Sequence, residues 1–103
     1  MVKIITRSGE IPRQGLVVVD FFATWCGPCK QIAPYYEQMA GTFTGVTFLK
    51  ADVDEFDDET GGTFEVGVLP TFMFLRDGVV LQTVKGADLN KVMKVLGDLE
   101  KGV

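Results

Sequence analysis

Histidine is missing from this sequence of 103 residues. Without an imidazole the chain has no histidine general base, no Cys–His nucleophilic pair and no histidine metal ligand. Any proton that moves during a reaction must therefore be carried by a carboxylate, a thiol, a lysine or water. Cysteine is nearly as scarce, because the sequence holds only two, Cys26 and Cys29.

Long apolar runs, basic clusters and targeting signals are missing too. No apolar stretch approaches the ~18 residues that cross a bilayer, and residues 1–10 lack the pattern of a secretory signal. The 14 acidic residues outnumber the 10 basic ones, and no basic stripe suits a phosphate backbone. We expect a single domain over residues 1–103, a cytoplasmic monomer that binds neither nucleic acid nor membrane. An organellar form that has lost a targeting segment stays open.

The order of apolar and turn-forming segments predicts an α/β domain. Residues 16–23 form a near-continuous apolar run, typical of a central strand that is buried on both faces. Asp77 and Gly78 separate two β-prone runs and predict a hairpin. The patterns predict strands at 2–6, 16–23, 46–51, 71–75 and 79–84, and helices at 30–39, within the acidic run 52–59 and after a cap at Asp88. Such an order gives a mixed sheet flanked by helices on both faces.

Cys26 and Cys29 allow three kinds of role. As a structural staple they would close a very small loop, which stabilises a fold little. As a zinc site they would supply two of the four ligands required. As a redox pair they fit well, because Cys26 would lie at a helix N-terminus, where free N–H groups favour a thiolate. Pro28 suits the first helical turn, and one turn brings Cys29 back beside Cys26, so the redox pair is the favoured interpretation.

The residues around the cysteines also resemble a known family. VVVDFFATWCGPCKQIAP, residues 17–34, closely resembles the active-site segment of the thioredoxin family, and CGPC is the form of the thioredoxins proper. LKADVDE (49–55), VGVLPTFMFLRDG (66–78) and VKGADLNKV (84–92) resemble later family segments in the right order. The resemblance implies a thioredoxin fold with four to five strands. Only residues 7–15 connect the first two strands, so we expect the family's first helix to be shortened or absent.

The resemblance assigns the chemistry to the two cysteines. Cys26 is the expected nucleophile, which attacks a disulfide in a client protein and forms a mixed disulfide. Cys29 is the expected resolving thiol, which attacks the Cys26 sulfur and releases the reduced client. Gly27 and Pro28 support the turn between them.

Asp20 is a charged residue in the middle of an apolar strand. Burial should raise the pKa of its carboxyl group, and this suits proton transfer. In the family the matching acid takes the proton of the resolving cysteine, so we expect this role toward Cys29. The other interpretation is a structural acid paired with a buried lysine. Lys50 matches the lysine that neighbours this acid in the family, so both roles can hold together.

Pro70 matches the family's cis-proline, so the resemblance implies a cis Leu69–Pro70 bond opposite the cysteines. The residue before it would pair with the client backbone. The resemblance then predicts a shallow apolar docking surface formed by Trp25, Gly27, Val68, Leu69, Gly86 and Ala87. Ordinary turn and core roles are the alternative for the last four.

The expected function is a protein-disulfide reductase that contributes to cell redox homeostasis. We expect the chain itself to bind no cofactor or metal, and the resemblance implies that a partner thioredoxin reductase supplies electrons from NADPH. It also implies clients such as peroxiredoxins, ribonucleotide reductases and methionine sulfoxide reductases. The alternatives are a thioredoxin-like docking module without turnover and a disulfide isomerase or oxidase, although such enzymes usually carry a histidine between the cysteines.

Overall fold

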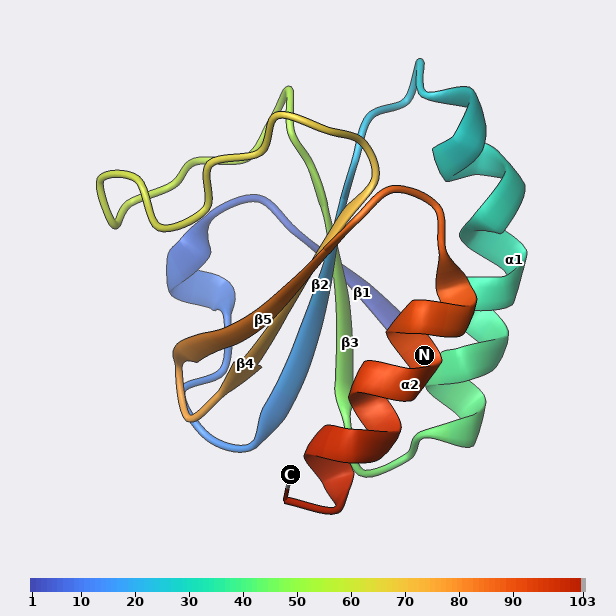
Figure 1. Cartoon of the computed structure of the whole chain (residues 1–103). Coiled ribbons are helices and arrows are strands. Elements are labelled where there is room, and N and C mark those ends of the chain that lie inside the picture. The colour runs from blue at the N-terminus through green and yellow to red at the C-terminus, as the bar shows by residue number, and fades with distance from the viewer. Residues whose placement is uncertain (103) are drawn as a thin grey trace.

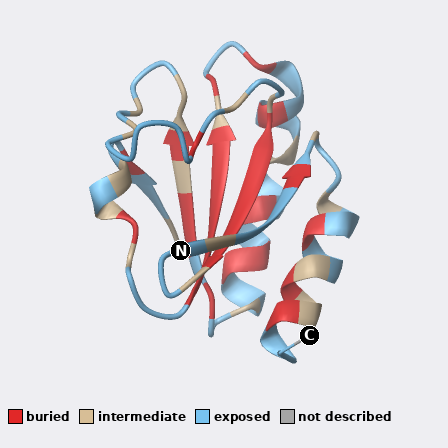
Figure 2. Ribbon diagram, turned by 60° about the vertical axis from the view of Figure 1, so that its left-hand side comes forward, coloured by how far each residue is buried: buried red, intermediate tan, exposed pale blue. Residues whose placement is uncertain are grey.

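A mixed five-stranded sheet forms the centre of the structure, a computed structural model that describes residues 1–102 (Figure 1). The strands are β1 (Val2–Ile5), β2 (Leu16–Phe22), β3 (Thr47–Asp52), β4 (Thr71–Arg76) and β5 (Val79–Lys85). They lie in the order β1-β3-β2-β4-β5, in which β3 is parallel to β1 and β2, and β4 is antiparallel to β2 and β5. The predicted central strand is therefore confirmed, because β2 pairs on both edges and is buried along nearly its whole length (Figure 2).

Both α-helices, α1 (Gly27–Thr42) and α2 (Leu89–Glu100), lie on one face of the sheet (Figure 1). Tyr36 of α1 is fully buried there, and its hydroxyl donates a hydrogen bond of 2.8 Å to the carbonyl of Leu49. Its ring lies 5.3 Å from Phe48, between centroids. The apolar stripe of α2 packs into the same core, and Asp88 caps this helix by accepting the Lys91 N–H at 3.1 Å.

The other face is covered by a 3-10 turn, η1 (Ser8–Glu10), and by the irregular segment 53–69. Phe21 of β2 meets the rings of Phe56 and Phe64, with centroids 5.3 and 6.0 Å away. These aromatic side chains fill the layer that an α-helix would otherwise occupy. Helices on both faces were expected, but this face carries only η1 within residues 1–102.

The helix predicted within residues 52–59 is wrong. The Asp52 side chain accepts the N–H of Asp54 at 3.0 Å, and the Asp58 side chain accepts that of Phe64 at 2.9 Å. Short acidic side chains that bond to nearby backbone in this way compete with helix formation. Gly61 and Gly62 then take positive φ angles of 83° and 136°, which a helix cannot accommodate.

The short first connection folds as expected, with no α-helix between β1 and β2. Its backbone bonds instead to the irregular segment: the Ser8 N–H donates to the Asp57 carbonyl at 3.0 Å. The Gly9 N–H donates to the Glu59 carboxylate at 2.8 Å, and the Glu59 N–H donates to the Ser8 hydroxyl at 2.9 Å. η1 therefore anchors the segment that covers the second face.

The remaining elements agree with the sequence prediction apart from their ends. α1 begins at Gly27 and extends to Thr42, and Pro34 lies within it. The hairpin turns at Asp77 and Gly78, which both have positive φ. Within residues 1–102 neither helix combines the length and apolar character that a membrane crossing requires.

Candidate active site

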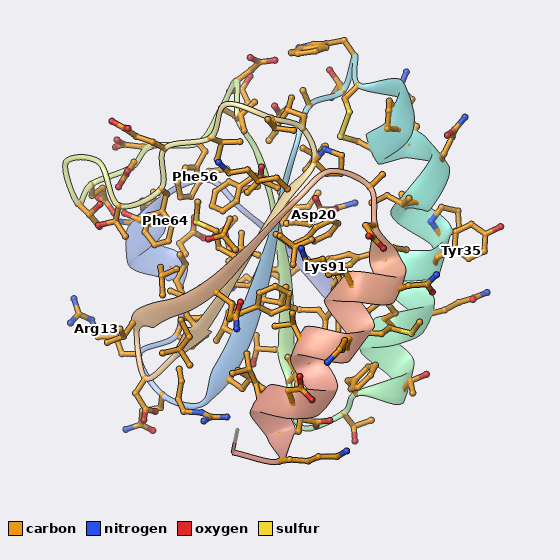
Figure 3. The ribbon with its side chains drawn as sticks, viewed as in Figure 1. Arg13, Asp20, Tyr35, Phe56, Phe64 and Lys91 are labelled. Atoms are coloured by element: carbon orange, nitrogen blue, oxygen red, sulfur yellow. A yellow bond between two sulfur atoms is a disulfide. The ribbon has the colours of Figure 1, made fainter. Side chains whose placement is uncertain are left out.

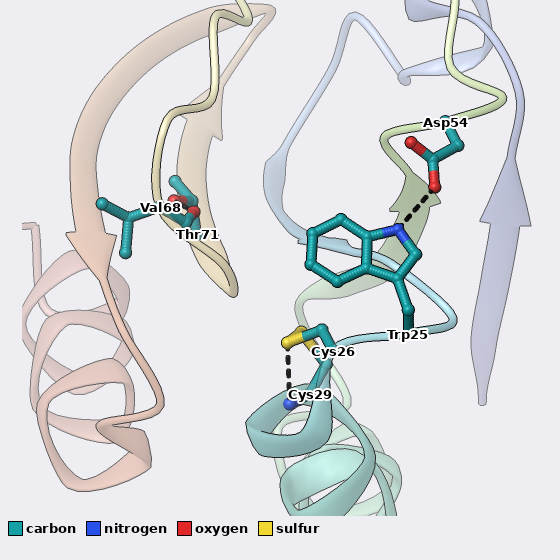
Figure 4. The surroundings of a disulfide bond; sticks show 6 residues. All are labelled: Trp25, Cys26, Cys29, Asp54, Val68 and Thr71. Atoms are coloured by element: carbon teal, nitrogen blue, oxygen red, sulfur yellow. Dashed lines mark hydrogen bonds between the residues drawn. A yellow bond between two sulfur atoms is a disulfide. The ribbon is translucent and has the colours of Figure 1, made fainter.

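The two cysteines lie at the start of α1, just after the end of β2. Cys26 is the N-cap residue of α1, and its sulfur accepts the backbone N–H of Cys29 at 3.2 Å (Figure 4). The two residues are joined by a disulfide, with their Cα atoms 5.3 Å apart. Pro28 occupies the first turn, where a backbone N–H is not needed. The predicted helix start and the pairing of the cysteines are thus present in the structure.

The two cysteines border different spaces although both are buried, with exposed fractions of 5% and 4%. Cys26 borders an open groove of about 510 Å³. The groove is lined by Trp25, Cys26, Gly27, Pro28, Val53, Val66, Gly67 and Leu69. Cys29 borders a smaller space of about 250 Å³, here called the inner cavity, which the exposed Thr24 and Lys30 leave partly open to solvent. The inner cavity is lined by Asp20, Phe22, Ala23, Thr24, Cys29, Lys30, Ala33 and Lys50. Cys26 therefore borders the larger of the two spaces, beside the exposed Trp25.

Trp25 forms one wall of the groove and is 68% exposed, which is unusual for so large an apolar side chain. Its indole N–H donates a hydrogen bond of 2.9 Å to Asp54 (Figure 4). Asp54 follows β3, which is parallel to β2, so the two strands end at the same edge of the sheet. This bond holds the ring beside the disulfide.

Asp20 lies in the middle of β2 and is 4% exposed. One of its carboxylate oxygens has no hydrogen-bond partner among residues 1–102, and the residue lines the inner cavity together with Cys29. Burial raises the pKa of this carboxyl group from 3.8 to about 7, and the positive charge of Lys50 opposes part of this rise. Asp20 is thus a buried carboxyl group beside Cys29 whose pKa lies near neutral pH.

Lys50 is paired with Asp20 across β2 and β3 but forms no ion pair with it in the described part of the chain. Its ammonium lies 5.5 Å from the centroid of the Phe22 ring. A structural Asp–Lys pair, the alternative suggested by the sequence, is therefore not formed. The lysine acts on Asp20 through its charge across the cavity.

The Leu69–Pro70 peptide bond is cis, as the resemblance implied. The Gly86 N–H donates to the Pro70 carbonyl at 2.8 Å, which ties this loop to the end of β5. Leu69 lines the groove, whereas Val68, Gly86 and Ala87 do not. Val68 is still 46% exposed on the neighbouring loop (Figure 4).

The structure thus brings Trp25, Gly27 and Leu69 of the predicted docking surface together beside Cys26. Sequence reasoning missed Val53 and Val66 as groove residues and Asp54 as the partner of Trp25. These residues belong to segments 49–55 and 66–78, which resemble the family. Only the fold shows that the two segments meet at the cysteines. No three Cys, Asp or Glu side chains within residues 1–102 are arranged to hold a metal ion.

Comparison with known proteins agrees with this geometry. Residues 8–97 match the family model described as Thioredoxin. The chain belongs to the thioredoxin family. Thioredoxin 1 of Plasmodium falciparum (isolate 3D7) is 45% identical over 92 residues, which span 85% of this chain and 88% of that protein. The bonded Cys26–Cys29 pair at the family's active-site position makes the chain a thiol–disulfide oxidoreductase.

Solved thioredoxin structures share the fold. A structure of Plasmodium falciparum thioredoxin is 38% identical, has a TM-score of 0.82 and covers 93% of this chain and 97% of its own. Another comes from a study of thiol resolution in yeast mitochondrial 1-Cys peroxiredoxin via glutathione/thioredoxin systems. It is 31% identical, with a TM-score of 0.83 and 94% coverage of both chains. The expected thioredoxin fold is confirmed.

Proposed function

We propose that this chain reduces disulfides in client proteins and is reduced again by a thioredoxin reductase that draws electrons from NADPH. The observation that carries the proposal is the asymmetry of the disulfide: Cys26 borders the open groove, and Cys29 borders the inner cavity with Asp20. The Cys26 thiol can contact a client, and the Cys29 thiol lies beside Asp20, which can accept its proton. NADPH would bind to the reductase.

Cys26 attacks first. As the N-cap residue it accepts the Cys29 N–H and lies at the positive end of the α1 dipole, and both favour its thiolate. The thiolate attacks one sulfur of the client disulfide, a Cys26–client bond forms, and the other client sulfur leaves as a thiolate that takes a proton from water. The docking surface around Trp25 and Leu69 holds the client meanwhile.

Cys29 then resolves the mixed disulfide. Asp20 accepts the Cys29 proton across the inner cavity, with a pKa of about 7 that suits this transfer near neutral pH. The Cys29 thiolate attacks the Cys26 sulfur, the Cys26–Cys29 bond forms, and the second client sulfur leaves and is protonated. Two electrons and two protons pass from the dithiol to the client in total.

The partners follow from the family. We propose that the chain works as a cytoplasmic monomer, and that peroxiredoxins, ribonucleotide reductases and methionine sulfoxide reductases are among its clients. The similarity to a structure from a yeast peroxiredoxin study supports the first of these.

Reduction of insulin disulfides, coupled to NADPH oxidation by a thioredoxin reductase, tests the proposal. We expect steady turnover with the wild-type chain and none above background with Cys26→Ser. Binding of insulin without turnover would instead favour a docking module, and reactivation of scrambled ribonuclease without net reduction would favour an isomerase. Equal turnover after Cys26→Ser would reject the assigned nucleophile.

A further inference from the structure

Negative charge is concentrated in one short part of the chain. Residues 52–65, here called the acidic segment, contain seven of the 14 acidic residues and none of the 10 basic ones. The rest of the chain therefore carries more basic than acidic residues, although the net charge is −4. Figure 3 shows carboxylate oxygens gathered along the segment that carries Phe56 and Phe64.

The acidic segment borders the groove that holds Cys26. Val53, near its start, and Val66, directly after its end, both line the groove. Asp54 is fixed at the groove wall by its 2.9 Å bond from the Trp25 indole. A client that enters the groove therefore meets Asp54 at the wall and lies beside the two ends of the acidic segment.

Three carboxylates of the segment remain free to act on a partner. Glu55, Asp57 and Glu65 are exposed and form no ion pair within residues 1–102, whereas Glu59 lies 3.7 Å from Arg7. Of the three, Glu55 and Glu65 are nearest in sequence to the groove residues Val53 and Val66. No lysine or arginine lines the groove, and Lys30 borders the inner cavity instead. The carboxylates do not converge on a metal site within this part of the chain. Basic side chains on a partner protein are the groups whose charge would complement them.

We infer that the groove prefers clients that carry lysine or arginine next to the disulfide to be reduced. This inference rests on the proposed function and names the chemistry of its substrates. Complementary charge at the rim of a docking site raises the association rate and loses its effect as salt screens it. The apolar groove supplies contact to any client, and the acidic segment selects among clients by charge.

Three peptides, each closed by one disulfide, test the inference. They differ only in whether lysine, serine or glutamate flanks the cysteines, and each is mixed with pre-reduced protein in a single turnover that is stopped by thiol alkylation. Each rate is divided by that of dithiothreitol with the same peptide, which removes differences in intrinsic reactivity. At about 10 mM salt we expect the lysine peptide to react roughly fivefold or more faster than the glutamate peptide, and at about 500 mM the two rates to converge.

A matched pair of variants assigns the effect to the acidic segment. Glu55→Gln/Glu65→Gln should lower the lysine-to-glutamate ratio toward one. Glu37→Gln/Glu100→Gln removes the same charge from exposed positions outside the segment and should keep the wild-type ratio. Equal rates for all peptides at low salt, or an equal fall of the ratio in both variants, would overturn the inference. Failure of even the serine peptide to react would instead contradict the proposed function.

Discussion

At the scale of single residues, Asp20 shows how the strand pattern and the site chemistry conflict. Its backbone pairs with Lys50 and Phe72 on both sides, as a central strand requires, while its carboxyl group is buried with one oxygen unpartnered. An apolar residue would stabilise this position better, because a buried charge without a partner is costly. This unfavourable burial is consistent with a functional role. It also makes the stability of the fold depend on pH.

We predict that oxidised wild-type protein loses stability relative to Asp20→Asn as the pH rises. The pKa of Asp20 is raised in the folded state, so this group binds more protons folded than unfolded. Its contribution is complete below the unfolded value of 3.8 and is lost as the pH passes through about 7. The difference between the unfolded and folded pKa values of Asp20 corresponds to at most about 4 kcal/mol of unfolding free energy. Urea unfolding at pH 4 and pH 8 measures it, and a constant gap between the two proteins would contradict the raised pKa.

We also predict that Asp20→Asn slows resolution of the mixed disulfide. Asparagine cannot accept the Cys29 proton, so release of the second client thiol should be at least about tenfold slower at pH 7.5. In the wild-type chain the same step should accelerate as the pH rises through about 7, where Asp20 ionises. Stopped-flow detection of client release separates this step from the first attack, which the variant should leave unchanged. An unaltered release rate would remove Asp20 from the mechanism.

At the scale of elements, the second face of the sheet is the unusual part of the molecule. Phe56 and Phe64 come from an irregular segment, yet they cover Phe21 as helical side chains would. The segment keeps its shape because the backbone N–H groups of Asp54 and Phe64 donate to the carboxylates of Asp52 and Asp58, and through its contacts with η1. The short connection between β1 and β2 is therefore compensated by this layer.

Phe64→Ala tests the importance of that layer. Phe64 is 8% exposed, so its truncation should lower the free energy of unfolding by about 3 kcal/mol. Tyr35→Ala, at a position that is 59% exposed on α1, provides an aromatic control that should cost less than about 1 kcal/mol. Denaturant unfolding compares the two. Equal losses would show that the irregular segment does not carry the second core.

The sequence predicted those elements whose pattern is local. The apolar run of β2, the Asp77–Gly78 turn and the Asp88 cap each leave a signal within a few residues. The acidic run 52–59 misled because acids favour both helix starts and Asx turns, and only tertiary contact with η1 and Phe21 decides between them. The C-terminal end of α1, at Thr42, was missed because helix ends depend on packing more than on propensity.

At the scale of the whole molecule, the parallel pairing of β2 with β3 places Cys26 beside Val53 and Asp54. The cis Leu69–Pro70 loop closes the same edge from the side of β4. The sequence identified most of these segments separately, and the resemblance gave their roles. Their convergence into one groove and one inner cavity is a property of the fold that spacing alone does not express.

The different positions of the two cysteines support the central claim that Cys26 attacks and Cys29 resolves. Trapping of a client by cysteine variants tests this claim most directly. Cys29→Ser should accumulate a mixed disulfide between Cys26 and the client, which mass spectrometry of the non-reduced complex identifies. Cys26→Ser should trap little or none, because Cys29 does not border the groove. A mixed disulfide through Cys29 in equal yield would contradict the account.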